Sequence, residues 1–310
     1  MTENKTLVIG TRGSKLALWQ ASYIAKLLEE KAQAQTELRI IKTKGDKILD
    51  VALSKIADKG LFVKEIENEL LAGGVDLAVH SMKDLPTEIP DGLIIAATTK
   101  REDNRDALIS LQYENLNALP EGAVVGTSSL RRKAQLLSLR PDLKAAEIRG
   151  NVDTRIKKLQ SGEYQAIIMA IAGLRRLSMD GYVKQIFSVD DFMPAVGQGA
   201  IGIEARAGDT EVLSLLEKIN NRKNLVEVTA ERALMKELQG GCQVPIGAVA
   251  VANDCVLELK ALVASLDGSE IIKGQNRGSS SEAELVGIEL AQRLKSQGAD
   301  KILDEIRKAL

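Results

Sequence analysis

The sequence contains very little cysteine, histidine or aromatic side chain. Its 310 residues include 2 cysteines, one histidine (His80) and 3% aromatic residues. Two cysteines in a chain of this length do not make a disulfide framework, so a reducing cytoplasm is the expected location. A single histidine excludes a multi-histidine metal site, and we expect no bound metal.

Long apolar runs and an excess of one charge are also missing. No stretch approaches the ~20 apolar residues of a membrane span, and the opening MTENKTLVIG lacks the features of a signal peptide. Lys and Arg total 42 against 43 Asp and Glu, whereas a nucleic-acid-binding protein usually shows a basic excess. We therefore expect neither a membrane nor a nucleic-acid partner. Any anion site has to come from local clustering.

Short apolar runs alternate with helical periodicity through the first two-thirds of the chain, which is typical of an α/β protein. "TLVIG" is predicted to be a strand, and Leu16, Trp19, Tyr23 and Leu27 are expected to share one face of the helix that follows. Cys255, in "NDCVLEL", is expected to be an ordinary strand cysteine. The length of the chain allows two or three domains.

Two breaks in the pattern indicate the domain organisation. The first is the polar run at 100–105 and the second is "MPAVGQG", and the pattern restarts after each. We expect two lobes with a cleft between them, a discontinuous one of residues 1–99 and 200–217 and a second of residues 100–199. Residues 218–310 read as a small C-terminal α+β domain. Nothing in the sequence requires more than a monomer.

Three junctions between a predicted strand and a helix combine small polar residues with arginine. They are "TRGSK" from Thr11, "TSSLRR" from Thr127 and "RGNVDTR" from Arg149. Free backbone N–H groups and the helix dipole favour an anion at such a junction, and arginine can hold a carboxylate through two parallel bonds. The alternative is that the hydroxyls only cap helices and the arginines are solvated. Three such junctions at the carboxyl ends of strands favour a ligand with several carboxylates.

"VHSMKDLP" places Lys83 and Asp84 at the end of an apolar strand that carries His80. Asp84 is either an aspartate that opens a turn or a carboxylate that stabilises positive charge or relays a proton in the cleft. His80 is expected to be buried inside the strand.

Cys242 lies in "QGGCQVP", between a glycine pair and Pro245. The glycines are expected to end the preceding helix, and the proline favours extended backbone before it, so the thiol is displayed on a loop. A metal site lacks further ligands, and a hydrolase would need His80 as its base. Covalent attachment of a prosthetic group remains, although the spacing alone supports it only weakly.

Ten motifs in order resemble those of the porphobilinogen deaminase (hydroxymethylbilane synthase) family, over essentially the whole chain. They include "GTRGSKLALWQ", "HSMKDLP", "GTSSLRR", "RGNVDTR", "PAVGQGAIGIE" and "GGCQVPIG". The resemblance implies two lobes like those of periplasmic binding proteins plus a third domain. It also implies a transferase that deaminates four porphobilinogen molecules and joins them into linear hydroxymethylbilane in tetrapyrrole biosynthesis. The implied cofactor is a dipyrromethane in thioether linkage to Cys242.

The resemblance also implies roles for residues that match the family's motifs. Asp84 would be the catalytic carboxylate, which stabilises the positive charge formed when ammonia leaves the substrate. Further cofactor contacts would come from Lys83, Thr127, Ser129, Arg131, Arg132 and Gly199. Substrate contacts would come from Arg12, Ser14, Lys55, Lys59, Phe62, Arg149, Arg155 and Arg176, with Phe62 covering the site.

A different class of protein stays open at this stage. A non-enzymatic binding protein for a carboxylate-rich small molecule would use the same two-lobed architecture. The absence of signal-peptide features and the displayed Cys242 argue against it.

Overall fold

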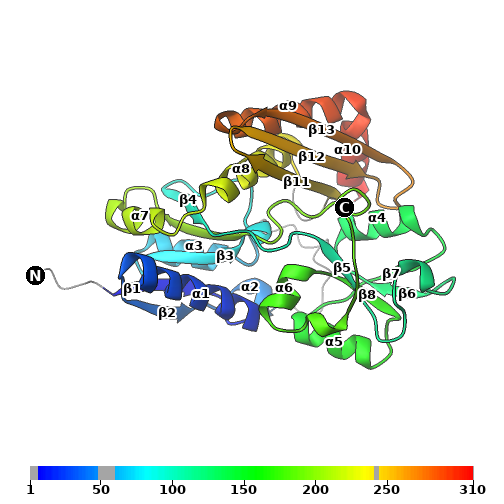
Figure 1. The fold of residues 1–310 in the computed structure, drawn as a ribbon, viewed down its shortest axis with the longest axis horizontal. Coiled ribbons are helices and arrows are strands. Elements are labelled where there is room, and N and C mark those ends of the chain that lie inside the picture. The colour runs from blue at the N-terminus through cyan, green and yellow to red at the C-terminus, as the bar shows by residue number, and fades with distance from the viewer. Residues whose placement is uncertain (1–5, 48–59, 241–243, 310) are drawn as a thin grey trace, which may run out of the picture. The chain divides into compact units, whose positions relative to one another are not determined.

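The computed structural model describes residues 6–47, 60–240 and 244–309, which form two compact units (Figure 1). The described part of the first unit comprises residues 6–47, 60–102 and 200–225. The second unit comprises 103–199, 226–240 and 244–309. Among the described residues, the chain therefore leaves the first unit after residue 102, returns to it at residue 200 and leaves it again after residue 225.

The first unit is built on a five-stranded sheet of order β2-β1-β3-β10-β4. Strand β10 lies antiparallel between β3 and β4, and the other four strands run in one direction. The strands are β1 Leu7–Thr11, β2 Thr36–Ile40, β3 Leu77–Ser81, β4 Leu93–Thr98 and β10 Ile201–Arg206. The helical segments are α1 Lys15–Ala32, α2 Lys44–Lys47, α3 Lys64–Leu71, η2 Met82–Asp84 and α7 Thr210–Glu217.

Helix α1 begins at the expected place, but its buried face is not the expected one. Trp19 is exposed, and Leu16, Tyr23 and Leu27 are only half-buried. The face that packs on the sheet carries Gln20, Ala21, Ile24, Leu28 and Ala32. The apolar residues chosen from the sequence therefore border the contact, whose fully buried residues include Ala21, Ile24 and Leu28.

The second unit contains a five-stranded sheet with the same arrangement, of order β7-β6-β8-β5-β9. Strand β5 lies antiparallel between β8 and β9, and again the other four strands run in one direction. The strands are β5 Asp106–Ile109, β6 Val124–Gly126, β7 Lys144–Ala146, β8 Ala166–Ala170 and β9 Val183–Ile186. The helical segments are η3 Leu116–Ala118, α4 Leu130–Leu139, α5 Val152–Gln160, α6 Ile171–Arg176 and η4 Asp180–Tyr182.

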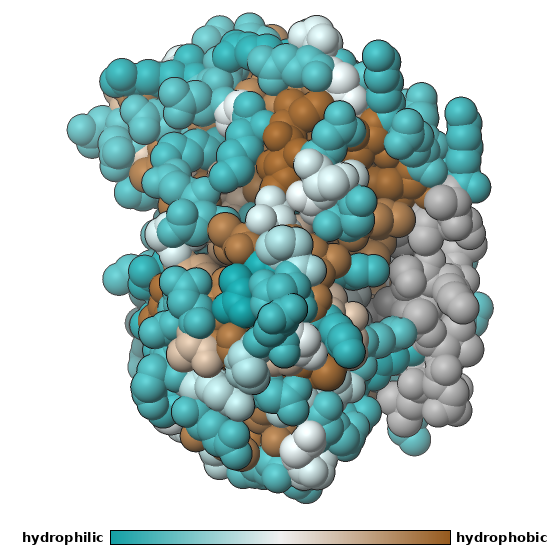
Figure 2. Space-filling view, turned by 90° about the vertical axis from the view of Figure 1, so that its right-hand side faces the viewer, coloured by the Kyte–Doolittle hydropathy of each residue, from teal (hydrophilic) through white to brown (hydrophobic). Residues whose placement is uncertain are grey.

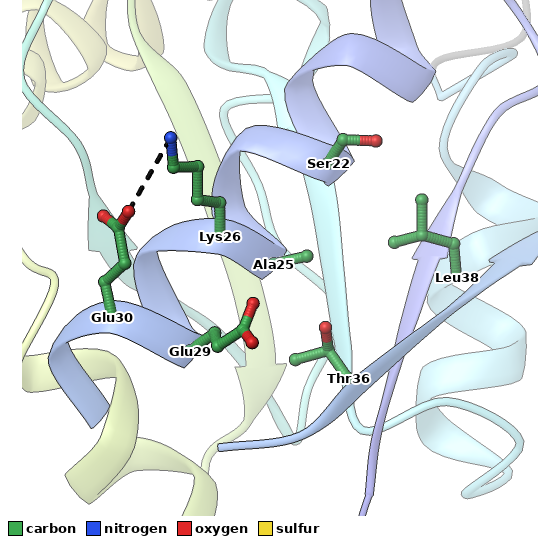
Figure 3. A pocket seen from close by; sticks show the side chains of 7 residues that line it. All are labelled: Ser22, Ala25, Lys26, Glu29, Glu30, Thr36 and Leu38. Atoms are coloured by element: carbon green, nitrogen blue, oxygen red, sulfur yellow. Dashed lines mark ion pairs between the residues drawn. The ribbon is translucent and has the colours of Figure 1, made fainter. Parts of the chain in front are cut away.

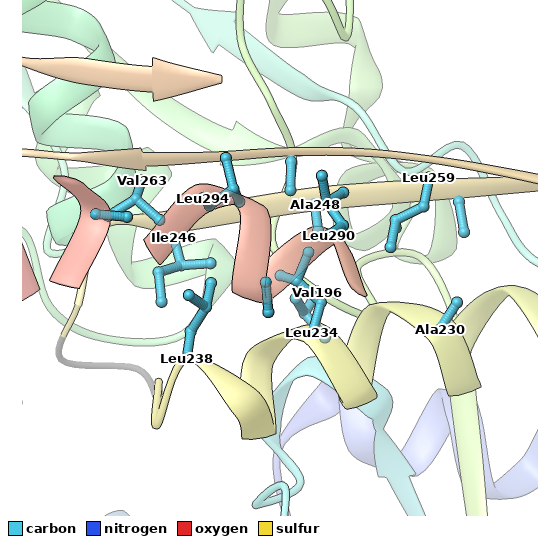
Figure 4. Close-up of a cluster of buried hydrophobic side chains, with 14 of the residues drawn as sticks. Val196, Ala230, Leu234, Leu238, Ile246, Ala248, Leu259, Val263, Leu290 and Leu294 are labelled. Atoms are coloured by element: carbon cyan, nitrogen blue, oxygen red, sulfur yellow. The ribbon is translucent and has the colours of Figure 1, made fainter. Parts of the chain in front are cut away.

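A three-stranded antiparallel sheet of order β11-β12-β13 completes the second unit. Its elements are α8 Arg222–Glu237, β11 Ile246–Asn253, β12 Val256–Ala264, β13 Ile271–Ser279, η5 Ser280–Glu282, α9 Ala283–Leu294, η6 Lys295–Ala299 and α10 Asp300–Ala309. One face of this sheet and the helices enclose an apolar core that includes Leu234, Ile246, Leu259 and Leu290 (Figure 4). The α/β class, the two similar lobes and the small C-terminal α+β part are confirmed.

Cys255 contradicts its sequence-based assignment. It is an exposed free cysteine in the turn that joins β11 to β12, not a residue of the strand. Asp254, before it, has a φ of 51°, which is the left-handed backbone of a tight turn.

Hydrophilic residues cover most of the surface that faces the viewer in Figure 2, as a sequence with 27% charged residues predicts. Among the described helices, none combines the length and the apolar character that crossing a membrane requires.

His80 is buried as expected, and two buried carboxylates lie around it. Its Nε2 atom is 2.9 Å from Oε2 of Glu204, on the neighbouring strand β10. Glu67 of α3 is also buried. Burial, together with the negative charge of Glu204, raises the pKa of Glu67 from 4.5 to about 7, although His80 and Lys64 oppose the shift. Glu67 thus keeps its proton well above the pH at which an exposed glutamate loses it.

A close approach of two helices fixes the C-terminal core at Gly287. A Cβ at this position of α9 would lie 2.3 Å from the backbone oxygen of Ala230 and 2.9 Å from Cβ of Ala233, both in α8. Only glycine fits there without movement of a backbone.

Gly287→Ala is therefore expected to destabilise the second unit by about 1–3 kcal/mol through overpacking, despite the ~1 kcal/mol that alanine gains over glycine in a helix. Thermal unfolding followed by circular dichroism measures the change. Gly181→Ala is the control, because no heavy atom lies within 4 Å of the added Cβ. Equal melting temperatures for the two variants would contradict the close approach.

The raised pKa of Glu67 predicts a pH-dependent stability. Between pH 4.5 and about 7 the folded state holds a proton that the unfolded state has lost, so the free energy of unfolding falls as pH rises, by about 1–3 kcal/mol. Glu67→Gln should abolish this decline. Denaturant titrations followed by fluorescence report on the first unit, because the chain has a single tryptophan, Trp19 in α1.

Glu69→Gln provides the control for this measurement, since Glu69 is exposed on the same helix. It should leave the decline unchanged. An unaltered decline in Glu67→Gln would remove Glu67 as its source.

Candidate functional site

The carboxyl edge of the first sheet brings together Arg12 and the pair Lys83–Asp84. Strands β1 and β3 are parallel neighbours, so the residues that follow them lie at the same edge. Arg12 comes directly after β1, and η2, which carries Lys83 and Asp84, comes directly after β3. Lys83 is half-buried and Asp84 is exposed.

Arg12 is held between an acid and an aromatic ring. Its Nε atom donates to Oδ1 of Asp46 at 3.2 Å, and its Nη2 atom donates to the same oxygen. The guanidinium carbon lies 4.2 Å from the ring centroid of Phe62, within the range of a cation–π contact. Phe62 thus covers Arg12.

The partners of Asp46 keep its carboxylate ionised. Burial alone would raise the pKa of Asp46, but the hydrogen bonds and charge of Arg12 and the bonds from Thr43 lower it overall. The hydroxyl of Thr43 donates to Oδ2 of Asp46 at 2.9 Å. A substrate carboxylate that binds Arg12 would therefore share this guanidinium with Asp46.

The carboxyl edge of the second sheet carries the other two predicted junctions. Strands β6, β7 and β8 are parallel, so the loops that follow them lie at one edge. Strand β5 is antiparallel, with Asp106 paired to Ala170, which places the first residue of β5 at this same edge. The expected site residues found here are Thr127, Ser129, Arg131, Arg132, Arg149, Arg155 and Arg176.

Arg131 and Arg132 are buried around one carboxylate, that of Asp106. They are 4% and 7% exposed, and Asp106 is 0% exposed. Oδ2 of Asp106 accepts from Nη1 of Arg131 at 2.7 Å. Oδ1 accepts from Nε and Nη2 of Arg132 at 3.0 and 2.8 Å. The two arginines are therefore not solvated surface residues.

Burial would raise the pKa of Asp106, but the positive charges and hydrogen bonds of Arg131 and Arg132 lower it far below its ordinary value. The carboxylate therefore stays ionised, and two guanidinium groups with one carboxylate leave the cluster with one net positive charge. Buried charge of this kind favours an anionic ligand.

The hydroxyls of the same edge act first on the backbone. Ser129 caps α4 and accepts from the N–H of Arg132 at 3.4 Å, and Oγ1 of the buried Thr127 accepts from the N–H of Ser129 at 3.3 Å. Ser14 caps α1 in the first unit and accepts from the N–H of Ala17 at 3.2 Å. Capping is thus real at Ser14 and Ser129. It leaves each hydroxyl proton able to donate to a ligand.

The remaining arginines border the same loops of the second unit. Nε of Arg155 donates to the carbonyl of Gly150 at 2.8 Å. Arg149, which directly precedes Gly150, is half-buried. Nη2 of Arg176 donates to the carbonyl of Gly199 at 2.7 Å. Gly199 has a φ of 86°, in the left-handed region that favours glycine.

Cys242, Lys55 and Lys59 lie outside the described residues. The chain before Cys242 is described up to Gly240, whose N–H donates to the carbonyl of Met235 at 2.8 Å. A Cβ on Gly240 would lie 2.3 Å from the sulfur of Met235. A side chain on the first glycine of the motif would therefore have to displace the side chain of Met235 at the end of α8.

The surface hollow drawn in Figure 3 is not this site. It lies between α1 and β2 and is lined by Ser22, Ala25, Lys26, Glu29, Glu30, Thr36 and Leu38. Its one drawn ion pair, Lys26 with Glu30 at 3.7 Å, is largely exposed. None of the expected site residues lines it. Among the described residues there is also no group of three His, Cys, Asp or Glu side chains placed to bind a metal.

Several buried polar residues were not predicted. Gln198 donates from Nε2 to Oδ1 of Asp106 at 2.9 Å. Glu231 accepts from the N–H groups of Gly197 and Ala250 at 2.7 and 2.8 Å, which ties the "PAVGQG" segment to β11. Two features of the sequence could have indicated such residues. Asp106 is an acid at the start of the apolar run "DALIS", and Glu231 is a glutamate within the motif "TAERA".

Two family models match successive parts of the chain. The family model "Porphobilinogen deaminase, dipyromethane cofactor binding domain" matches residues 7–214. The model "Porphobilinogen deaminase, C-terminal domain" matches residues 225–296.

Individual relatives agree with the family models. Porphobilinogen deaminase of Chloroherpeton thalassium is 50% identical over 308 residues, which cover 98% of each chain. That of Syntrophomonas wolfei is 51% identical over 305 residues, 98% of this chain and 100% of that one. A solved structure, a putative methionine-binding lipoprotein from Bacillus subtilis, covers 71% of this chain and 92% of its own at 13% identity and a TM-score of 0.44. With both family models matched and half of the residues shared over the full length, the chain belongs to the porphobilinogen deaminase family.

Proposed function

We propose that the chain deaminates four porphobilinogen molecules and joins them head to tail into linear hydroxymethylbilane, as a transferase of tetrapyrrole biosynthesis. The observation that carries this proposal is the arginine-rich edge of the second sheet, with its buried net positive charge, in a chain that belongs to this family. Each porphobilinogen brings an acetate and a propionate. The growing product is therefore a polyanion, whereas the whole chain has a net charge of -1.

The donor set of the second unit fits a bound dipyrromethane cofactor. Buried guanidinium groups and capping hydroxyls offer N–H and O–H donors, which suit pyrrole carboxylates. We propose that Cys242 carries the group through a thioether, and that its contacts come from Lys83, Asp84, Thr127, Ser129, Arg131, Arg132 and Gly199. When bound, this group supplies the pyrrole end to which each substrate unit is joined.

Asp84 is the proposed catalytic residue. Its carboxylate is exposed at the end of β3, with no acid among its direct sequence neighbours. An ionised carboxylate here would bind the pyrrole N–H of porphobilinogen and stabilise the positive charge that develops as ammonia leaves. The amino group of Lys83 beside it suits a pyrrole carboxylate.

The remaining basic residues complete the proposed substrate set. The guanidinium group of an arginine stays charged at every physiological pH, so the arginines of the set act as fixed partners for carboxylates. Phe62 lies over one of them, Arg12. The set is Arg12, Ser14, Lys55, Lys59, Phe62, Arg149, Arg155 and Arg176.

We also propose three domains: residues 1–99 with 200–217, residues 100–199, and residues 218–310. The three separate sheets support this division. A monomer and a cytoplasmic location remain part of the proposal, and the low cysteine content supports the latter.

The cofactor proposal predicts that the intact chain, made in cells that synthesise haem, weighs more than its sequence by one dipyrrole unit. Cys242→Ala should remove this excess, because the thioether has no sulfur to form on. Cys255→Ala is the matched control and should keep the excess, since Cys255 is the only other cysteine and lies on an exposed turn. Intact-mass spectrometry measures all three. If the chain without substitutions had the mass that its sequence gives, a non-enzymatic binding protein would be favoured.

Asp84→Asn should keep the attached group but lose at least about a hundredfold in turnover, because the amide carries no charge to stabilise the cation. Intact mass and the rate of porphobilinogen consumption test the two halves of this expectation. Glu88→Gln removes an exposed acid four residues away and should retain normal turnover. Near-normal rates in Asp84→Asn would take the catalytic role away from Asp84.

A further inference from the structure

We propose that Asp106, assisted by Gln198, is a positioning residue that orients Arg131 toward the carboxylates of the bound pyrrole chain. This inference rests on the proposed function, because it concerns the same anionic ligand. Asp106 itself is not proposed to touch the ligand, since it is 0% exposed and its carboxylate is occupied by protein donors.

Protein donors saturate the carboxylate of Asp106. Oδ1 accepts three hydrogen bonds, two from Arg132 and one from Gln198 at 2.9 Å, and Oδ2 accepts one from Arg131. All four donors and the acceptor belong to the second unit. A carboxylate with this many partners cannot rotate without the loss of several charge-assisted bonds, so it defines a fixed point.

The two arginines differ in how many of their nitrogen atoms make hydrogen bonds. All three nitrogens of Arg132 make hydrogen bonds, Nε and Nη2 to Asp106 and Nη1 to the carbonyl of Ile168 at 3.1 Å. Arg131 bonds through Nη1 alone, to Asp106 and to the carbonyl of Met193. Within the described part of the chain, Nε and Nη2 of Arg131 make no hydrogen bond. Arg131 thus keeps one side of its guanidinium group available while the other side is fixed.

Gln198 holds the carboxylate of Asp106 in place. Its Nε2 atom donates to the carboxylate and to the carbonyl of Asn104 at 2.8 Å, so it holds the start of β5. Its Oε1 atom accepts from Nη2 of Arg132 at 3.4 Å. Gln198 is 0% exposed and directly precedes Gly199. The carboxylate is therefore held by a side chain from the "PAVGQG" crossing as well as by the two arginines.

The charge count agrees with this geometry. A second carboxylate beside Arg131 would neutralise the cluster, and a ligand carboxylate can supply it through the available Nε and Nη2 atoms. In Asp106→Asn an amide NH₂ group replaces one of the two acceptor oxygens. One arginine therefore loses its hydrogen-bond acceptor and its fixed direction. The effect on the ligand should then pass through Arg131.

The test measures how readily the cofactor-free chain acquires its dipyrrole unit from porphobilinogen. Intact-mass spectrometry gives the porphobilinogen concentration that loads half of the chains in a fixed time. Asp106→Asn and Arg131→Gln should each raise this concentration about tenfold, as expected for one misplaced charge-assisted bond. The double variant should also show about tenfold, because both changes remove the same contact.

A merely structural role for Asp106 gives different results. In that case the effects of the two substitutions multiply to about a hundredfold, or the melting temperature of Asp106→Asn falls while its half-loading concentration stays that of the unmodified chain. Either result overturns the inference. Gly287→Ala controls for lost stability in the same unit and should load normally.

Gln198→Met keeps the inference testable if Asp106→Asn does not fold. It removes one of the four donors to the carboxylate and leaves both arginines in place, so we expect a two- to threefold rise in the half-loading concentration. No rise would overturn the role of Gln198 and Asp106 in positioning. If the unmodified chain itself gains no mass, the proposed function fails, and that outcome is distinct from a failure of this inference.

Discussion

The burial of two neighbouring guanidinium groups beside a single carboxylate is the constraint on which the functional edge of the second unit depends. Isolated charges of this kind are strongly unfavourable inside a protein. Asp106 makes their burial tolerable because it accepts bonds from both, and the backbone carbonyls of Ile168 and Met193 accept others. The surplus positive charge that remains is a property of the fold before any ligand arrives.

The two five-stranded sheets place chemistry in equivalent positions. In each, four strands that run in one direction end at the edge that carries the basic loops, and the single antiparallel strand begins there. The first unit presents Arg12 and Asp84 at this edge, and the second presents the buried arginine pair. The same sheet topology thus presents an exposed acid in the first unit and a buried arginine pair in the second.

Much of the architecture could be predicted from the sequence. Helix α4 can be predicted from the sequence, because Ser129 suits its N-cap and apolar residues recur along one face. Short strands that mix polar and apolar residues have no comparably clear pattern. For example, β9 reads "VKQI" and is defined by its pairing with β5. The buried face of α1 was misplaced because it includes Gln20 and Ala21, and neither stands out as a core residue.

The candidate site divides in the same way. Motifs located Arg12, Asp84 and the arginines, because these side chains follow strands at recognisable junctions. The partners that set their geometry, Asp46, Asp106 and Gln198, come from distant parts of the chain, and no local pattern pairs them. Cys255 was misassigned because its place in a two-residue turn depends on the register of β11 with β12.

The insertion of β10 between β3 and β4 has a consequence for biosynthesis. Strand β4 has no neighbour in its sheet until the chain has grown beyond residue 200, by which point all five strands of the second sheet have been made. The lobe that begins first is therefore completed later, and its unpaired strand edges remain exposed on the ribosome in the meantime. A chain released early, anywhere within the second lobe, would leave the first lobe with an open sheet and a tendency to aggregate.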